Sequence, residues 1–199
     1  GNATAEIGIV VSDNSIYSSI TGAFGIHINF ADGLVVSGNN IRNFTNAITN
    51  SGSANACVDF NITGNNWYNC ATAIYFIVSF AGMVISNNVC ETLTAAGIFL
   101  DPGAVFTYDC VVSGNTVRDA ATDGIYIDSG GMYTVTGNHV YSAGDNGIEI
   151  GATVEDSTIS SNVVVTPTTD GIRINGSTRC QVVGNTVHNP TVNGIRLAN

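Results

Sequence analysis

A repeat of about 24 residues runs through the chain and restricts it to a solenoid. A β-branched segment ends at an Asn eight times, at intervals of 22 to 28 residues. The eight residues are Asn14, Asn39, Asn65, Asn87, Asn115, Asn138, Asn162 and Asn185. A Gly or Ala followed by Ile recurs with a similar period, at Gly25, Ala47, Ala73, Gly97, Gly124, Gly147, Gly171 and Gly194. Two columns with a common period indicate stacked repeats that each pack on their neighbours.

Apolar and polar residues alternate within each repeat, which is the periodicity of a strand rather than of a helix. The unit from Gly124 to Asn146 shows this best, with strand segments GIYI, YTVTG and HVY separated by turns. Each unit therefore predicts three short strands, and coils of this kind stack in parallel about 4.8 Å apart. We name the sheet of the Gly/Ala-Ile strands the first sheet. The strands before the Asn form the second sheet, and those after it form the third.

The Asn column is expected to be structural. It lies at a sharp bend, which favours a left-handed backbone conformation. Stacked Asn side chains can also hydrogen-bond along the axis, as they do in cross-β ladders. Replacing Asn115 should therefore lower stability and leave activity unchanged.

These columns resemble the right-handed parallel β-helix family, which includes pectate-lyase-like enzymes and phage tailspikes. The resemblance extends from Asn14 to Leu197 and includes the family's asparagine ladder. It implies an all-β, single-stranded parallel β-helix with three parallel sheets and about eight coils. We expect residues 1–199 to form one such domain, cut from a longer chain. The fold hosts lyases, hydrolases, epimerases and non-catalytic scaffolds, so the resemblance indicates fold more firmly than function.

The charge of the chain restricts its partners. The chain has five Arg, no Lys and 15 acidic residues, which gives a net charge of −10. This balance disfavours nucleic acid and anionic membranes and leaves glycans, proteins and divalent cations. We find no signal-peptide pattern and no apolar run long enough to cross a bilayer. With the family resemblance, this predicts an extracellular or virion-surface protein.

The cysteines and histidines do not suggest a metal site or a disulfide framework. Five Cys is an odd number, and no CxxC is present. Cys110 and Cys180 share a column with Leu34, Phe60 and Tyr133, so we interpret them as small buried residues. The three His have no ligand spacing. We therefore expect no cofactor and no bound metal.

The outward side chains of the first sheet are the leading functional candidates. Their column reads His27, Thr49, Tyr75, Phe99, Tyr126, Glu149, Arg173 and Arg196. In the polysaccharide-acting proteins of the resembled family, this sheet lines the substrate groove. We therefore predict that sugars bind along Tyr75, Phe99 and Tyr126, with Arg173 and Arg196 as further binding residues.

Three carboxylates are the catalytic candidates: Asp101, Asp128 and Glu149. Asp101 and Asp128 are equivalent positions of adjacent coils, with backbones about 5 Å apart if the register holds. Two carboxylates this close raise one pKa, as a glycosidase requires. They could also bind Ca²⁺, although no calcium motif is present. Asp101 and Asp128 could instead cap turns, and Glu149 could form a cross-strand ion pair with Arg173.

A column of Asp or Asn precedes the Gly-Ile of the later coils. It comprises Asp123, Asn146, Asp170 and Asn193. We interpret this column as turn chemistry.

The other two sheets offer competing surfaces. The outward column of the third sheet reads Tyr17, Arg42, Tyr68, Cys90, Arg118, Tyr141, Val165 and His188. Its Tyr and Arg residues are typical of recognition surfaces, so Tyr17, Arg42, Tyr68, Arg118 and Tyr141 form an alternative binding face. The second sheet is flat and nearly uncharged, and we expect Met83 and Ile85 to point outward there. A homotrimer would cover such a strip.

The sequence therefore favours a carbohydrate-directed β-helix that binds a polysaccharide. If it is catalytic, it would act as a polysaccharide lyase or glycoside hydrolase. The alternative is a non-catalytic structural or adhesive solenoid that mediates oligomerisation or receptor binding. An ice-binding face is a third hypothesis, since Thr134 and Thr136 form one T-x-T motif.

Overall fold

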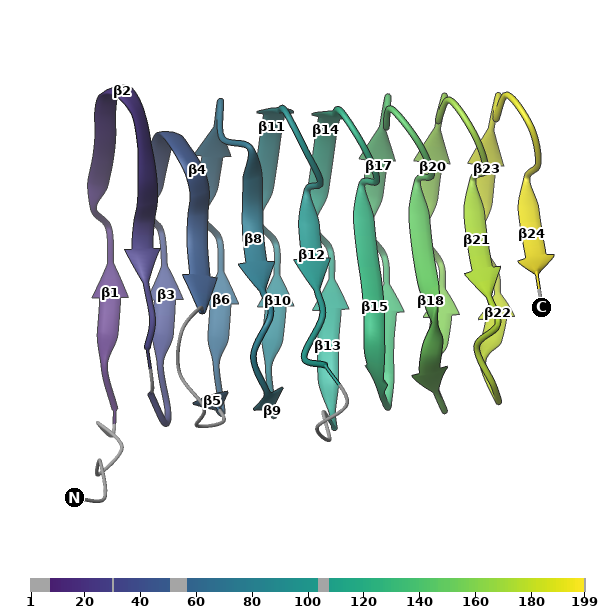
Figure 1. Ribbon diagram of the computed structural model, residues 1–199, viewed down its shortest axis with the longest axis horizontal. Helices are drawn as coiled ribbons and strands as arrows, with labels where there is room; N and C mark the ends of the chain where they lie inside the picture. Colours follow the sequence, from purple (N-terminus) through teal and green to yellow (C-terminus); the bar gives the residue numbers. More distant parts are fainter. Residues whose placement is uncertain (1–7, 30, 51–56, 104–107, 199) are drawn as a thin grey trace.

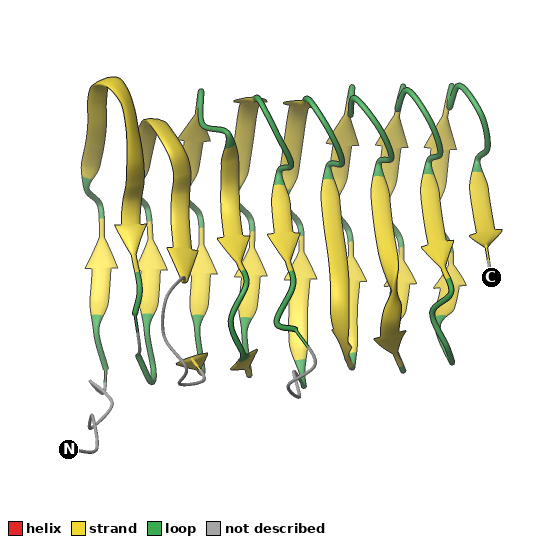
Figure 2. Ribbon diagram, in the orientation of Figure 1, coloured by secondary structure: helices red, strands yellow, loops and turns green. Residues whose placement is uncertain are grey.

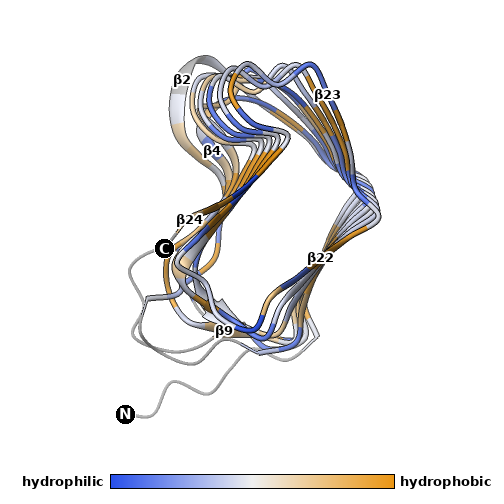
Figure 3. Ribbon diagram, turned by 90° about the vertical axis from the view of Figure 1, so that its right-hand side faces the viewer, coloured by the Kyte–Doolittle hydropathy of each residue, from blue (hydrophilic) through white to orange (hydrophobic). Residues whose placement is uncertain are grey.

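The chain folds into a right-handed parallel β-helix (Figure 1). The computed structural model describes residues 8–29, 31–50, 57–103 and 108–198. These residues form strands joined by turns and loops (Figure 2). No helix in these ranges could span a membrane. Viewed along the axis, successive coils follow one closed outline (Figure 3).

The second sheet contains eight parallel strands in chain order. They are β1 (Val10–Ser12), β3 (Val35–Ser37), β6 (Asn61–Thr63), β10 (Val84–Ser86), β13 (Cys110–Ser113), β16 (Tyr133–Thr136), β19 (Thr158–Ser160) and β22 (Gln181–Val183). Eight stacked strands enclose seven complete turns of the β-helix. This is slightly fewer than the roughly eight coils expected from the sequence.

The first and third sheets are joined into one 14-stranded sheet because two strands run through both. These are β2 (Ser15–His27) and β4 (Asn40–Asn50). The first sheet continues with β8 (Thr72–Phe76), β12 (Ile98–Leu100), β15 (Ile125–Gly131), β18 (Ile148–Glu155), β21 (Ile172–Asn175) and β24 (Ile195–Ala198). The third continues with β7 (Asn66–Tyr68), β11 (Val89–Leu93), β14 (Thr116–Ala120), β17 (His139–Tyr141), β20 (Val163–Val165) and β23 (Thr186–His188). A small pair, β5 (Cys57–Val58) and β9 (Phe80–Ala81), completes the fold.

The predicted apolar columns form the core. The Ile of the Gly/Ala-Ile motif in each first-sheet strand pairs with its equivalent in the next coil, for example Ile98 with Ile125 and Ile125 with Ile148. All three side chains are fully buried. Each such side chain contributes roughly 1.5–3 kcal/mol. Cys110 is buried in register with Tyr133, as its column predicted.

The asparagine ladder is present and continuous. Asn115 Nδ2 donates to Asn138 Oδ1 at 3.0 Å and to the Ile85 carbonyl at 2.9 Å. The backbone N–H of Asn115 donates to the same Asn138 oxygen at 3.0 Å. Each rung therefore satisfies backbone groups of the neighbouring coil that burial would otherwise leave unpaired.

One rung of the ladder was assigned wrongly from the sequence. The ladder residue is Asn88, whose Nδ2 donates to Asn115 Oδ1 at 2.9 Å. Asn87 lies outside the core and has φ 55°. The left-handed residue of this bend is thus the one before the ladder Asn, where other coils have Gly38, Gly64 or Gly114. The predicted position of the left-handed conformation was wrong by one residue.

The shift at Asn88 moves the second- and third-sheet strands of its coil by one residue, whereas Phe99 on the first sheet keeps its predicted place. Met83 and Ile85 are fully buried, and Val84 and Ser86 point outward in their place. Val84 pairs with Asn61 and Val111. The outward strip of the second sheet is therefore less apolar than expected, which weakens the argument that it is covered in a homotrimer.

Left-handed corners also follow the third sheet. Seven non-Gly residues there have φ between 51° and 64°. They are Asn43, Asn69, Thr92, Asp119, Ser142, Thr166 and Asn189. Asn and Asp adopt this conformation more readily than other non-Gly residues, whereas β-branched Thr is disfavoured in it. These corners direct the chain back toward the first sheet.

Candidate functional site

An aromatic ladder lies on the outer face of the first sheet. Tyr75, Phe99 and Tyr126 pair in register on β8, β12 and β15. The rings of Tyr75 and Phe99 are stacked, with centroids 5.2 Å apart and planes inclined by 15°. The Tyr126 ring meets Phe99 edge-to-face at 5.3 Å and 68°. Tyr75 and Phe99 therefore cover each other's faces, whereas the ring of Tyr126 is turned out of the stack.

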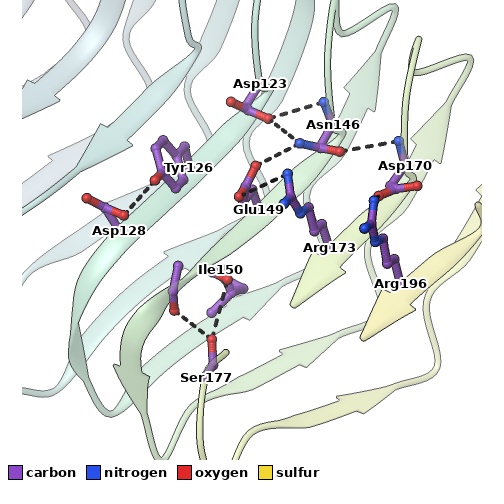
Figure 4. A network of polar contacts seen from close by, with 11 residues as sticks. Asp123, Tyr126, Asp128, Asn146, Glu149, Ile150, Asp170, Arg173, Ser177 and Arg196 are labelled. Atoms are coloured by element: carbon purple, nitrogen blue, oxygen red, sulfur yellow. Dashed lines mark hydrogen bonds and ion pairs between the residues drawn. The ribbon is translucent and has the colours of Figure 1, made fainter. Parts of the chain in front are cut away.

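A hydrogen bond fixes the Tyr126 ring in this orientation. Its hydroxyl donates to Asp128 Oδ1 at 2.5 Å, so the ring extends along its own strand (Figure 4). Burial, and then this bond to Asp128, raise the pKa of the Tyr126 hydroxyl. Tyr126 therefore stays neutral and keeps its proton at neutral pH.

Asp101 and Asp128 directly follow paired residues of adjacent strands, Leu100 and Ile127, as the repeat predicted. They have different partners. Asp101 Oδ1 accepts bonds from Ser129 Oγ at 2.8 Å and from the Gly103 N–H at 3.1 Å. The bond to Gly103 caps a turn, which is the alternative role that the sequence suggested for Asp101. Their pairing as acid and base stays a prediction.

A buried pair of carboxyl groups lies beside Tyr126 (Figure 4). The Asn146 Nδ2 donates to Asp123 Oδ1 at 3.0 Å and to Glu149 Oε2 at 2.7 Å. Asp123 is 8% exposed and Glu149 is 7% exposed. Burial is the main cause that raises the pKa of each carboxyl, and Asp123 further raises that of Glu149. A carboxyl group with a raised pKa is suited to proton donation.

Asp123 belongs to a polar ladder that sequence reasoning interpreted only as turn chemistry. The Asn193 N–H and Nδ2 both donate to Asp170 Oδ1, at 3.2 and 2.6 Å. The Asp170 N–H donates to Asn146 Oδ1 at 3.3 Å. The signal that could have identified this ladder is the alternation Asp, Asn, Asp, Asn, which places an amide donor next to each carboxylate.

The two predicted binding arginines neutralise acids of the preceding coil. Arg173 Nη1 lies 3.6 Å from Glu149 Oε1, which is the cross-strand ion pair considered as an alternative. Arg196 Nη1 lies 3.7 Å from Asp170 Oδ2. That Asp170 oxygen and Arg173 Nε are buried and, among the described residues, have no hydrogen-bond partner. Glu149 and Asp170 are thus each paired with an arginine of the following coil.

The outward column of the third sheet differs from the prediction at one rung. Cys90 is buried, and Glu91 takes its place between Tyr68 and Arg118. Glu91 forms an ion pair with Arg118. The guanidinium of Arg118 also lies over the Tyr141 ring at 5.6 Å. The reason is again the one-residue shift of this coil.

Potential metal ligands are dispersed. His27 contacts the Phe24 ring on the first sheet, and His139 and His188 lie in different columns of the third, two coils apart. Burial raises the pKa of the Cys90 and Cys110 thiols, which opposes the thiolate form that binds metals. Among the described residues, no three His, Cys, Asp or Glu side chains are grouped to hold an ion.

Known structures share the fold of this chain. A T265N mutant of the periplasmic alginate epimerase AlgG is 15% identical, with a TM-score of 0.72, over 95% of this chain and 50% of that one. DFA-IIIase from Arthrobacter chlorophenolicus A6 in complex with GF2 is 19% identical (TM-score 0.65; 99% and 60% covered). The Streptococcus pneumoniae surface protein and adhesin PfbA is 14% identical (TM-score 0.63; 94% and 67%). The chain thus spans 50% of the epimerase and 60% of DFA-IIIase.

No curated protein sequence matches the chain. A family model does, however, match residues 7–199, which is nearly the whole sequence. The chain therefore belongs to the family described as periplasmic copper-binding protein (NosD).

Proposed function

We propose that this protein binds polysaccharide along the first sheet, with Tyr126 at the centre of the site. The observation that carries the proposal is the orientation of the Tyr126 ring. The ring is turned 68° from Phe99 and held by Asp128, so it does not continue the stack. An aromatic face outside a stack is a large apolar surface that a sugar ring can cover. Tyr75 and Phe99 extend this surface along the axis as ring edges.

Charged groups next to Tyr126 add polar contacts for sugar hydroxyls. Glu149 is the register partner of Tyr126, and Arg173 is the partner of Glu149. Each stands one coil further along the axis. A glycan chain that lies along the axis would therefore pass from an aromatic contact to hydrogen-bonding groups. Such a mixture of apolar surface and a few polar groups is common in ligand sites.

If the bound chain is also cleaved, Glu149 is suited to protonate the leaving oxygen. Its raised pKa favours the protonated form, and Asn146 orients the carboxyl group. In a hydrolase the second carboxylate acts as base or nucleophile. Asp128 is the candidate for that role because it borders Tyr126. Binding does not depend on this step.

The comparisons support a protein of this class without identifying its ligand. Structural neighbours include proteins named as an alginate epimerase and a DFA-IIIase, each below 20% identity. The family is described as periplasmic, so we expect a location outside the cytoplasm. Copper does not fit the donors of this chain, since its histidines are dispersed and four of its five thiols are buried.

A non-catalytic structural or adhesive solenoid that mediates oligomerisation or receptor binding is the competing function, and its observable difference is the lack of glycan binding. The ice-binding hypothesis receives less support. Some hydroxyls of the second sheet bond to one another, as Ser86 Oγ does to Thr63 Oγ1 at 3.1 Å. Such hydroxyls are less available to order water.

A glycan array tests the proposal, with Tyr126→Ala and Tyr141→Ala compared. The second variant removes an aromatic ring from the third sheet and serves as the matched control. We expect Tyr126→Ala to weaken glycan binding at least about tenfold, given the apolar area it removes. Tyr141→Ala should retain the binding of the native protein to the same glycans.

Equal binding by both variants, or no glycan binding by the native protein, would contradict the proposal. Assays for new reducing ends and for unsaturated products on each bound glycan then separate hydrolase, lyase and simple binder. Loss of product in Glu149→Gln with binding retained would identify Glu149 as the proton donor.

A further inference from the structure

The third sheet carries a second group of exposed side chains that the first-sheet site does not use. Tyr17, Arg42 and Tyr68 occupy one outward column on three consecutive coils and pair in register. Tyr17 is 75% exposed and Tyr68 is 44% exposed. The two rings flank Arg42 at about one coil spacing, or 4.8 Å, on either side along the axis.

Arg42 differs from the other arginines in its ion pairing. Within the described residues, Arg118, Arg173, Arg179 and Arg196 each have a carboxylate within ion-pair distance. Arg42 has none there. Its Nε donates to the neutral Asn40 Oδ1 at 2.9 Å, and its guanidinium lies 6.0 Å from the centre of the Tyr68 ring.

An exposed guanidinium without a counter-ion has unused donors. It presents N–H groups in a planar fork that matches the two oxygens of a carboxylate. In a protein with a net charge of −10, a positive group of this kind is unusual. The tyrosines on both sides supply apolar area without charge. The strip therefore suits a ligand that is largely uncharged and carries an occasional carboxylate.

The size of the strip favours a single sugar chain over a protein. Three coils and one three-residue strand width cover on the order of 150 Å². A stable protein interface needs about 800 Å² on each partner. A glycan that lies along the axis meets Tyr17, Arg42 and Tyr68 in sequence and needs no wider surface.

We propose that Tyr17, Arg42 and Tyr68 form a second polysaccharide-binding site, which takes a sugar that carries a carboxylate group. The carboxylate pairs with the Arg42 guanidinium, and the neighbouring sugar rings contact the two tyrosines. This inference rests on the proposed function for the class of ligand. It uses different residues on a different sheet, so each can fail alone.

Calorimetric titration with two probes tests the site. The first is a sugar tetramer with one uronic acid among neutral sugars, and the second is the same tetramer with that carboxyl group reduced to an alcohol. Arg42→Gln removes the charge at an exposed position, and its melting temperature should match that of the native protein. We expect this variant to bind the acidic tetramer at least about tenfold more weakly at the third sheet. The neutral tetramer should bind both proteins alike.

Arg118→Gln is the matched control, because Arg118 lies in the same column but is already paired with Glu91. It should change the affinity for the acidic tetramer by less than about threefold. Tyr126→Ala separates the two sites: in that background the Arg42 Nε–H signal should still shift in NMR spectra when the acidic tetramer is added.

Four results would overturn the inference. The first is an unchanged affinity of Arg42→Gln for the acidic tetramer. The second is an equal loss in Arg118→Gln, which would indicate a general charge effect. The third is that the native protein binds acidic proteins but neither tetramer, and that Arg42→Gln no longer binds the acidic proteins. Loss of all binding in Tyr126→Ala, with no Arg42 signal shift, would leave only the first-sheet site.

Discussion

At the scale of single residues, backbone conformation at the corners is a source of strain. Thr92 has φ 57°, a left-handed conformation that β-branched residues rarely adopt. The equivalent residues of the two preceding coils are Asn43 and Asn69, whose side chains bond to each other at 2.8 Å. Thr92 therefore occupies a position that Asn fits better.

We predict that Thr92→Asn stabilises the protein by about 0.5–1 kcal/mol. The change relieves the backbone strain and extends the row of corner asparagines by one coil. Urea unfolding measures the difference. Thr94→Asn, at a nearby exposed residue whose φ is not positive, is the control and should change stability little. A similar gain in both variants would show that the backbone conformation is not the cause.

At the scale of the repeating element, the Asn ladder connects all coils at one corner. Asn115 serves four groups: it donates to Asn138 and Ile85, and it accepts from the N–H and the side chain of Asn88. All three asparagines are fully buried. Removal of one amide therefore leaves donors and acceptors in two neighbouring coils without partners.

Asn115→Ala should lower the free energy of unfolding by about 2–4 kcal/mol, since several buried polar groups lose their bonds. The same substitution at Asn185, which is only partly buried, should cost about half as much because water can replace the lost bonds. Chemical unfolding compares the two variants. Glycan binding should stay unchanged in both, and a loss of binding at unchanged stability would contradict a structural role.

The same element shows what the sequence could and could not predict. The period and the strand columns were readable because each repeat places Ile, Val and Asn at fixed offsets. The coil with Asn87 and Asn88 was misassigned because its spacing allows either residue, and only the packing of Met83 and Ile85 decides between them. The same one-residue shift explains why Cys90, which is buried, was predicted to point outward.

The candidate site was predictable only in part, for a related reason. The outward column from Tyr75 to Arg196 follows directly from the repeat. The orientation of Tyr126 depends on where Asp128 lies, and the raised pKa of Asp123 depends on burial beneath neighbouring coils. Such contacts combine residues of several coils, and no single repeat contains that information.

At the scale of the whole molecule, the buried carboxyl groups connect stability to pH. Burial raises the pKa of Asp123 and of Glu149 above their ordinary values of 3.8 and 4.5. In the range between the ordinary and the raised pKa values, the folded protein holds more protons than the unfolded chain. The free energy of unfolding therefore falls as pH rises through this range.

We predict that Asp123→Asn raises the melting temperature at pH 8 more than at pH 4. The Asn side chain keeps an oxygen acceptor for Asn146 and removes the buried charge. The control is Asp156→Asn, because Arg179 lowers the pKa of this exposed carboxyl. Its effect should have the opposite sign, and most of any loss of stability should be present at pH 4 as well as at pH 8, because a carboxyl with a lowered pKa stabilises the fold above its ordinary pKa of 3.8. Equal shifts for Asp123→Asn at both pH values would exclude a buried charge at this position.

The two side-chain ladders also have a consequence for the electric field of the molecule. In the Asn ladder, each Oδ1 accepts from the preceding coil, as Asn138 does from Asn115. In the Asp/Asn ladder, Asn146 Oδ1 accepts from Asp170 of the following coil. The amide dipoles of the two ladders therefore point in opposite directions along the axis. An α-helix adds its peptide dipoles head to tail, whereas here the two sets partly cancel. Since the net charge is −10, the potential along this β-helix is set mainly by its acidic and arginine side chains, and the face on which a ligand is captured depends on where those charges are left unpaired.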